Sequence, residues 1–139
     1  MPLARNDLLC PIALMRSHRD QKYLDFIRAQ PCCITGFRDT VIAHHVKLYG
    51  GGGAGLKPSD YLTVPLRHDM HQELHDRGEP SFWLKYNLSP GSVIEKHLVQ
   101  CVQPGTNLEE IFKSPTAIMV GDGRLRALIE AVATWRLPR

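Results

Sequence analysis

The chain has 139 residues, a formal net charge of +3 and 43% hydrophobic residues. These values are ordinary for a soluble globular protein, and they exclude the disordered, fibrous and histone-like classes. No apolar run approaches the roughly 18 residues that cross a bilayer. Cys10 and Pro11 interrupt the N-terminal apolar stretch, and Asp7 precedes it where a secretory signal would carry only positive charge. We therefore expect a cytoplasmic protein that forms a single domain over residues 1–139.

The predicted elements of the first half alternate between helix, strand and loop. Apolar residues recur with a helical period before Pro31, and β-branched residues surround His44 and His45 as they do in strands. Four consecutive glycines from Gly50 favour a loop, because no regular element tolerates such a run. In chain order we predict a helix at 19–30, a strand or tight turn at 32–37, a strand at 40–46, a loop at 49–59 and a strand at 61–66 that Pro65 interrupts.

The second half is predicted to be helical. His68, His71 and His75 recur three and four residues apart, so they share one helix face, and Gly78 supplies a stop. Ser81 and Asn107 are residue types that cap helix N-termini. The predicted helices are 67–77, one that Ser81 caps and that runs to Tyr86, 92–102, 107–113 and 124–137.

Histidine is the residue type that stands out, because five of the seven histidines lie between positions 44 and 75. Two histidines one turn apart on a helix project the same way at a separation that one ion can bridge, so His71 and His75 predict half of a metal site. The strand pair His44-His45 is the expected source of a third ligand. Adjacent strand residues point to opposite faces, so we expect one histidine of the pair to bind metal and the other to be free for proton transfer.

Short motifs between residues 31 and 86 follow one another in a distinctive order. They are Pro31-Cys32, Ala43-His44-His45, the glycine loop with Lys57 and Asp60, Val64-Pro65-Leu66, His71, His75, Gly78 and Phe82. In this order they resemble the His-Asn-His (HNH) endonucleases, particularly the phage-type branch that includes recombination-enhancement nucleases. The resemblance implies an α+β fold with a ββα-metal (His-Me finger) core at 32–86 and helical extensions at 1–31 and 87–139.

The resemblance also implies a role for each histidine of the motif. His45 is the implied general base, Asp60 stands at the family's Asn position, and a divalent ion such as Zn, Ni, Mn or Mg is implied at the metal site. His68 could replace His71 as a ligand if the helix begins one turn earlier. The implied metal ligands are His44, His71 and His75, and Lys47, Lys57 and Arg67 flank the loop and could reach the phosphates of DNA.

The chain departs from the family at the structural zinc that many relatives hold between two cysteine knuckles. The four corresponding positions are Cys32, Thr35, Arg67 and Met70. One thiolate with Thr, Arg and Met cannot form a tetrahedral zinc site. We therefore predict that no structural zinc is present and that apolar packing of the flanking helices stabilises the motif.

Three functions stay open from the sequence. The first is a DNA endonuclease, the second a nucleic-acid-binding recombination accessory protein without efficient cleavage, and the third a hydrolase of small phosphoesters. The intact His44-His45 pair favours the first over the second, and the glycine loop suits a polymer better than a small molecule. The expected partner is DNA, with a recombination or phage protein as a further candidate, while the oligomeric state and the form of the DNA stay open.

Overall fold

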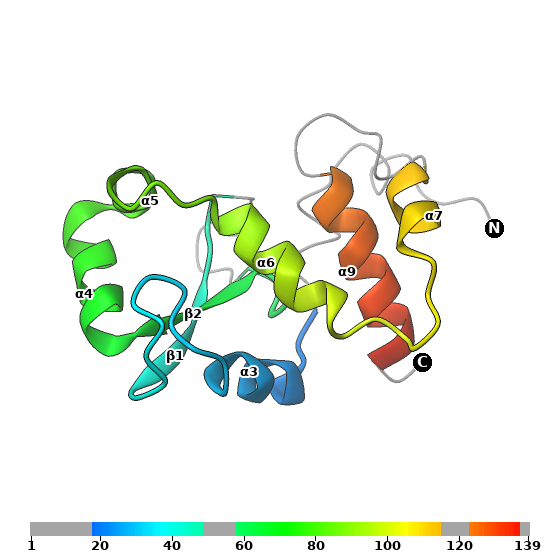
Figure 1. Ribbon diagram of the computed structural model, residues 1–139, viewed down its shortest axis with the longest axis horizontal. Helices are drawn as coiled ribbons and strands as arrows, with labels where there is room; N and C mark the ends of the chain where they lie inside the picture. The colour runs from blue at the N-terminus through cyan, green and yellow to red at the C-terminus, as the bar shows by residue number, and fades with distance from the viewer. Residues whose placement is uncertain (1–17, 49–57, 115–122, 137–139) are drawn as a thin grey trace.

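The computed structural model describes residues 18–48, 58–114 and 123–136. Its fold is α+β, as predicted, with a two-stranded antiparallel hairpin followed directly by a helix and flanked by further helices (Figure 1). The elements in chain order are α3 (Gln21–Arg28), β1 (Val41–His45), β2 (Thr63–Arg67), α4 (His68–Arg77), α5 (Glu79–Lys85), α6 (Pro90–Val99), α7 (Leu108–Lys113) and α9 (Gly123–Arg136).

The hairpin pairs His44 with Val64 and Ala43 with Pro65. We predicted that Pro65 would interrupt the second strand, and this was wrong because β2 continues through it. The Pro65 carbonyl accepts a hydrogen bond from Cys33 N at 3.0 Å, so the polar edge of this residue faces away from β1. The N–H that proline lacks would point to that same edge, so β1 and β2 lose no ladder hydrogen bond.

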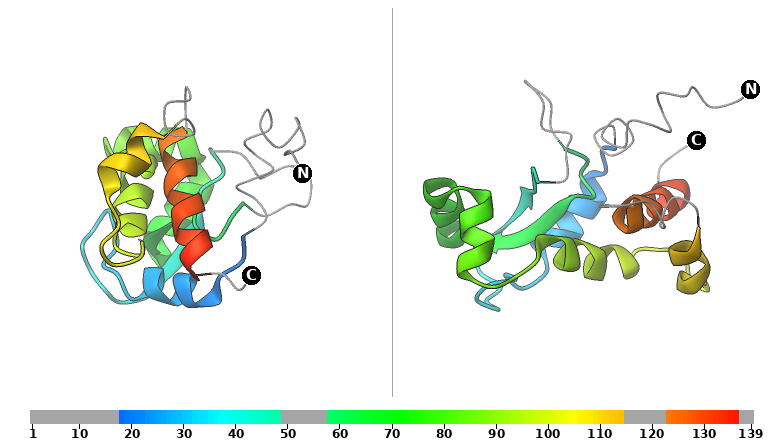
Figure 2. Two further views of the ribbon diagram at one scale, coloured as in Figure 1. Left: turned by 90° about the vertical axis from the view of Figure 1, so that its right-hand side faces the viewer. Right: turned by 90° about the horizontal axis from the view of Figure 1, so that it is seen from above.

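The helices cover the hairpin from several sides. Helices α3 and α4 contact both strands, and α6 contacts β2. Helix α9 packs on α6 and α7 packs on α9, which places α4 with α5 and α7 with α9 at opposite ends of the molecule (Figures 1 and 2). No helix in the part of the chain that the structure describes has the length and apolar character needed to span a membrane.

One apolar core joins the hairpin to the helices on both sides of it. Its members include Leu66 of β2, Leu74 of α4, Phe82 of α5 and Ile94 of α6, all of which are buried. Burying side chains of this size stabilises a fold by about 1.5–3 kcal/mol each. The flanking helices therefore contribute apolar packing directly to the strands and helix that carry the histidines.

Several predicted elements differ in detail from the structure, among them α6, which runs from Pro90 to Val99 with Ser89 as its N-cap where a helix at 92–102 was predicted. Residues 33–35 form a turn, which decides between the strand and the turn predicted for 32–37. Ser81 was predicted to cap a helix, but α5 already begins at Glu79 after Gly78. The reason is Pro80 in the first turn of α5, where its fixed φ favours helix and its missing N–H has no partner to lose. Asn107 does cap α7, because its side chain accepts from Glu109 N and Glu110 N.

Asp20 connects the N-cap of α3 to the C-terminal helix. Its carboxylate accepts hydrogen bonds from Tyr23 N at 3.0 Å and from the Tyr61 hydroxyl at 2.8 Å. Arg136 of α9 adds an ion pair in which Nε lies 2.8 Å from Oδ2. Burial raises the pKa of Asp20, but Arg136 and the two hydrogen bonds outweigh burial and hold it below its usual value.

We expect Asp20→Ala to lower the free energy of unfolding by about 3 kcal/mol, since it removes a helix cap and leaves Arg136 without its carboxylate. Urea denaturation measures the change. The matched control is Asp25→Ala on the same helix, because the side-chain contacts of Asp25, an ion pair with Arg28 and a hydrogen bond from Gln21, are both exposed. That variant should change stability by less than about 1 kcal/mol, and equal losses in the two variants would refute the role of Asp20.

His97 makes stability depend on pH. It is buried on α6, with Nδ1 2.8 Å from the Val93 carbonyl, and burial lowers its pKa. The unfolded chain therefore takes up this proton at a higher pH than the folded chain, so stability is complete above about pH 6.5 and falls as the pH drops below it. Urea denaturation in EDTA at a series of pH values measures the effect. His97→Gln should reduce the dependence of the free energy of unfolding on pH, whereas His68→Gln, at an exposed position, should not.

Candidate metal centre

The side chain of His44 is buried where β1 faces helix α4. It is 5% exposed, whereas the adjacent His45 projects from the other side of the strand toward Asp60. Strand geometry requires this division, because successive side chains point to opposite faces. The structure thus gives the two neighbouring histidines separate surroundings.

His71 and His75 lie one turn apart on α4 and complete a group of three imidazoles with His44. The ring centroids of His71 and His75 are 4.3 Å apart, and that of His44 lies 5.0 Å from His71 and 6.0 Å from His75. One nitrogen from each ring lies within 4.8 Å of the others. These three side chains could hold a metal ion.

The donor set fits a transition metal. Three imidazole nitrogens at about 2.0–2.1 Å from a tetrahedral ion lie about 3.3 Å from one another. The Nε2 atoms of His71 and His75 are 2.9 Å apart, so small side-chain rotations bring the group to ligand geometry. Because one of these two nitrogens carries a proton in the hydrogen bond, binding of an ion would displace that proton.

His71 has the electrostatic properties of a ready ligand. Burial and the positive charges that His44 and His75 can carry lower the pKa of His71 to about 4. Its imidazole is therefore neutral at pH 7, with a lone pair available for an ion. His68 was a predicted alternative to His71, but it is absent from the three-histidine group found among the described residues.

Glu79 contacts this group and was not predicted from the sequence. Its Oε1 lies 3.1 Å from His44 Nε2 and 3.0 Å from Lys47 N, and its Oε2 accepts from Trp83 Nε1 at 3.0 Å. Burial raises the pKa of Glu79, but these hydrogen bonds outweigh burial and lower it. The position of Glu79 directly after Gly78 was visible in the sequence, whereas its contact with a histidine 35 residues away was not.

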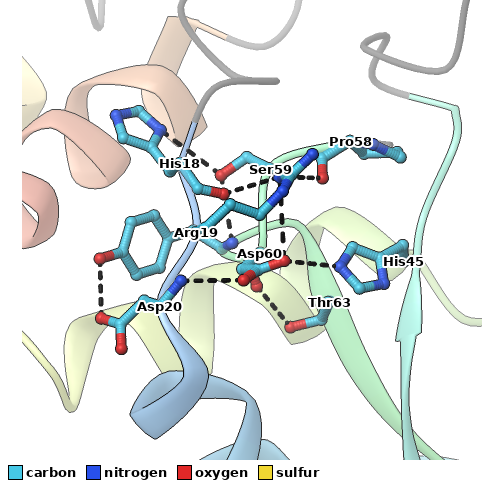
Figure 3. Close-up of polar contacts among 9 residues, drawn as sticks. His18, Arg19, Asp20, His45, Pro58, Ser59, Asp60 and Thr63 are labelled. Carbon is cyan, nitrogen blue, oxygen red and sulfur yellow. Dashed lines mark hydrogen bonds and ion pairs between the residues drawn. The ribbon is translucent and has the colours of Figure 1, made fainter. Parts of the chain in front are cut away.

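On the other face of β1, His45 is held by Asp60. The two side chains meet at 2.9 Å between His45 Nε2 and Asp60 Oδ1, as Figure 3 shows. Asp20 N donates to Asp60 Oδ2 at 2.8 Å, and the Thr63 hydroxyl donates to the Asp60 carbonyl at 2.8 Å. Arg19 adds a nearby positive charge, with its guanidinium 3.9 Å from Oδ1. Asp60 is buried and fixed from several directions, so it restrains the ring of His45.

The structure describes two of the three predicted phosphate-binding residues, Lys47 and Arg67. Lys47 is exposed, and its backbone N–H donates to the Glu79 oxygen that also contacts His44. Arg67 forms ion pairs with Asp39 at 3.4 Å and Asp69 at 3.5 Å. Lys57 and most of the glycine loop lie outside the described residues. Of the two that the structure describes, Lys47 is the one whose backbone N–H binds the same carboxylate oxygen as His44.

The four positions that correspond to the zinc knuckles of the family, Cys32, Thr35, Arg67 and Met70, have contacts within the protein. Cys32 Sγ accepts from Thr35 N at 3.5 Å, and Met70 packs partly buried against the core. Burial raises the pKa of Cys32, but hydrogen bonds from Thr35, Arg67 N and Ile34 N outweigh burial and lower it. Hydrogen bonds thus fix the turn at 32–35, and apolar contacts connect it to the core.

Comparisons with known proteins give one match. No curated protein and no solved structure matches the chain. A family model described as "Protein of unknown function (DUF968)" matches residues 12–94, a range that includes the three-histidine group, Glu79, His45 and Asp60. Because this match covers more than half of the 139 residues, the chain belongs to the DUF968 family.

Proposed function

We propose that the protein is a metal-dependent DNA endonuclease. The observation that carries this proposal is the placement of two kinds of histidine on one strand. His44 belongs to a three-imidazole group that could hold an ion, and the adjacent His45 lies outside that group and is bound by a carboxylate. A metal site beside a restrained imidazole supplies the two requirements of phosphodiester hydrolysis, charge stabilisation and proton transfer.

The order of the elements supports the resemblance to the HNH endonucleases. The hairpin β1–β2 followed by α4 has the ββα order of that family, with His44 and His45 on β1 and His71 and His75 on α4. Asp60 departs from the family's Asn. Its carboxylate contacts the ring of His45, so we assign it to the orientation of the base.

The proposed base acts through one ring nitrogen of His45. When Nε2–H donates to Asp60 Oδ1, Nδ1 keeps its lone pair and can accept a proton. His45 Nδ1 takes the proton of the attacking water, the water oxygen bonds to phosphorus, and the bond from phosphorus to the 3′ oxygen breaks. His44, His71 and His75 would hold the divalent ion, which would supply positive charge to stabilise the charge that develops on the phosphate during this step.

Cleavage of supercoiled plasmid tests the proposal. Protein stripped with EDTA should leave the plasmid intact, and addition of Mn, Mg, Ni or Zn should restore conversion to the nicked or linear form. Duplex, single-stranded and branched oligonucleotides in parallel reactions identify the preferred DNA. Binding of DNA without cleavage by any of the four ions would overturn the proposal in favour of an accessory protein.

A further inference from the structure

The carboxylate of Glu79 lies behind the metal centre. Glu79 is the first residue of α5 and follows Gly78, whose φ of +90° lies in a region that favours glycine. After this turn Glu79 begins α5, which packs against α4. The Glu79 side chain, which is 11% exposed, reaches a histidine on a different element.

We propose that Glu79 is a positioning residue of the metal centre, which holds His44 in the tautomer and orientation that a ligand needs. The proposal rests on the metal centre of the proposed function. His44 Nε2–H donates to Glu79 Oε1 at 3.1 Å, so Nδ1 is the ring nitrogen that this hydrogen bond leaves for an ion. Carboxylates behind ligand imidazoles fix the ring and increase its basicity toward the ion.

The other contacts of Glu79 keep it from acting as a mobile ligand. Oε1 also accepts from Lys47 N, and Oε2 accepts from the buried indole of Trp83. Both oxygens are therefore held, and among the described residues Glu79 is not part of the group whose ligand atoms lie within 4.8 Å of one another. The geometry assigns it to orientation of His44 rather than to direct contact with the ion.

Glu79 also connects the metal centre to the segment that enters the glycine loop. His44 and Lys47 lie on either side of the end of β1, and one carboxylate oxygen binds both. This shared contact fixes the position of the His44 ring relative to the backbone at Lys47. Loss of this carboxylate should affect the metal ligand first, because its ring has freedom to rotate about two side-chain torsions.

Metal affinity of defined variants tests the assignment. Purified protein stripped with EDTA is titrated with Zn in competition with a chelator, and the dissociation constants of wild type, Glu79→Ala and Glu79→Gln are compared. Glu79→Ala should weaken binding about 10- to 100-fold, the range for loss of such a hydrogen bond. The dissociation constant of Glu79→Gln should lie between those of wild type and Glu79→Ala, because an amide oxygen can still accept the hydrogen bond from His44 Nε2–H but carries no charge.

Glu73 provides the matched control. It is a carboxylate on α4 that binds Lys85 and the Tyr86 hydroxyl and has no contact with His44. Glu73→Ala should change the Zn dissociation constant less than about threefold, and unfolding in EDTA should show that the variants are folded. If Glu79→Ala binds Zn as tightly as Glu73→Ala does, the role of Glu79 is refuted.

A spectroscopic readout separates orientation from a general loss of structure. Trp83 donates to Glu79, and the other tryptophan of the chain, Trp135, can be replaced by Phe to leave one reporter. In that background Zn should change the emission of Trp83, and Glu79→Gln should reduce the change at saturating Zn. An undiminished change in Glu79→Gln would contradict the proposal. Failure of the wild type to bind Zn would overturn the metal centre and the role of Glu79 together.

Discussion

Replacing His45 with alanine should reduce plasmid cleavage about 100- to 10,000-fold, the contribution of a general base. The three histidines that could hold an ion are grouped on the other face of β1, so the affinity for Zn should stay within about threefold of wild type. Initial rates of cleavage under single-turnover conditions measure the first effect, and competition titration measures the second. Added imidazole should restore part of the lost rate, because it can occupy the space of the missing ring.

His68→Ala is the control for this experiment. His68 lies on α4 and is exposed, and it is not one of the three clustered histidines of the described residues. Its removal should leave the cleavage rate within about threefold of wild type, as expected for a surface side chain away from such features. Equal rates for wild type and His45→Ala would show that His45 is not the base and would remove the centre of the nuclease proposal.

The second large effect is expected from His75→Ala. His75 is exposed, so its removal opens no cavity in the core. In the proposed metal centre it supplies one of three ligand nitrogens. We therefore expect the affinity for Zn to fall by more than about 100-fold, which exceeds the loss expected for a residue that only orients a ligand. Metal-dependent cleavage should fall with it at low ion concentration.

Thermal unfolding provides the measurement for His75. Zn at 100 times its dissociation constant stabilises a folded protein by about 2.7 kcal/mol if only the folded state binds it. Wild type should show this shift in Tm, and His75→Ala should lose most of it while its Tm in EDTA stays close to that of wild type. A full shift in the variant would mean that the ion binds elsewhere.

The sequence predicted the elements around the histidines because their signals are local. The spacing of His71 and His75 requires a shared helix face, and the adjacency of His44 and His45 requires opposite strand faces. The error at Pro65 had a different origin. Whether a proline interrupts a strand depends on which edge its missing N–H faces, and the contact with Cys33 that decides this is tertiary.

The same dependence on tertiary contacts explains why the hydrogen bonds that hold His44 and His45 were not predicted from the sequence. Glu79 reaches His44 across 35 positions, and Asp20 donates its backbone N–H to Asp60 across 40. No periodicity links residues so far apart. Asp60 was expected at the family's Asn position, whereas its bond to the ring of His45 became visible only in three dimensions. The directions in which these side chains point could therefore be learned only from the structure.

Anomalous diffraction from Zn-soaked crystals tests the central claim most directly, since it locates the ion and its ligands together. The expected result is one peak with nitrogens of His44, His71 and His75 at about 2.0–2.1 Å, with His45 on Asp60 and outside the coordination sphere. A peak coordinated by His45, or a zinc at Cys32 with no peak among the three histidines, would contradict the account.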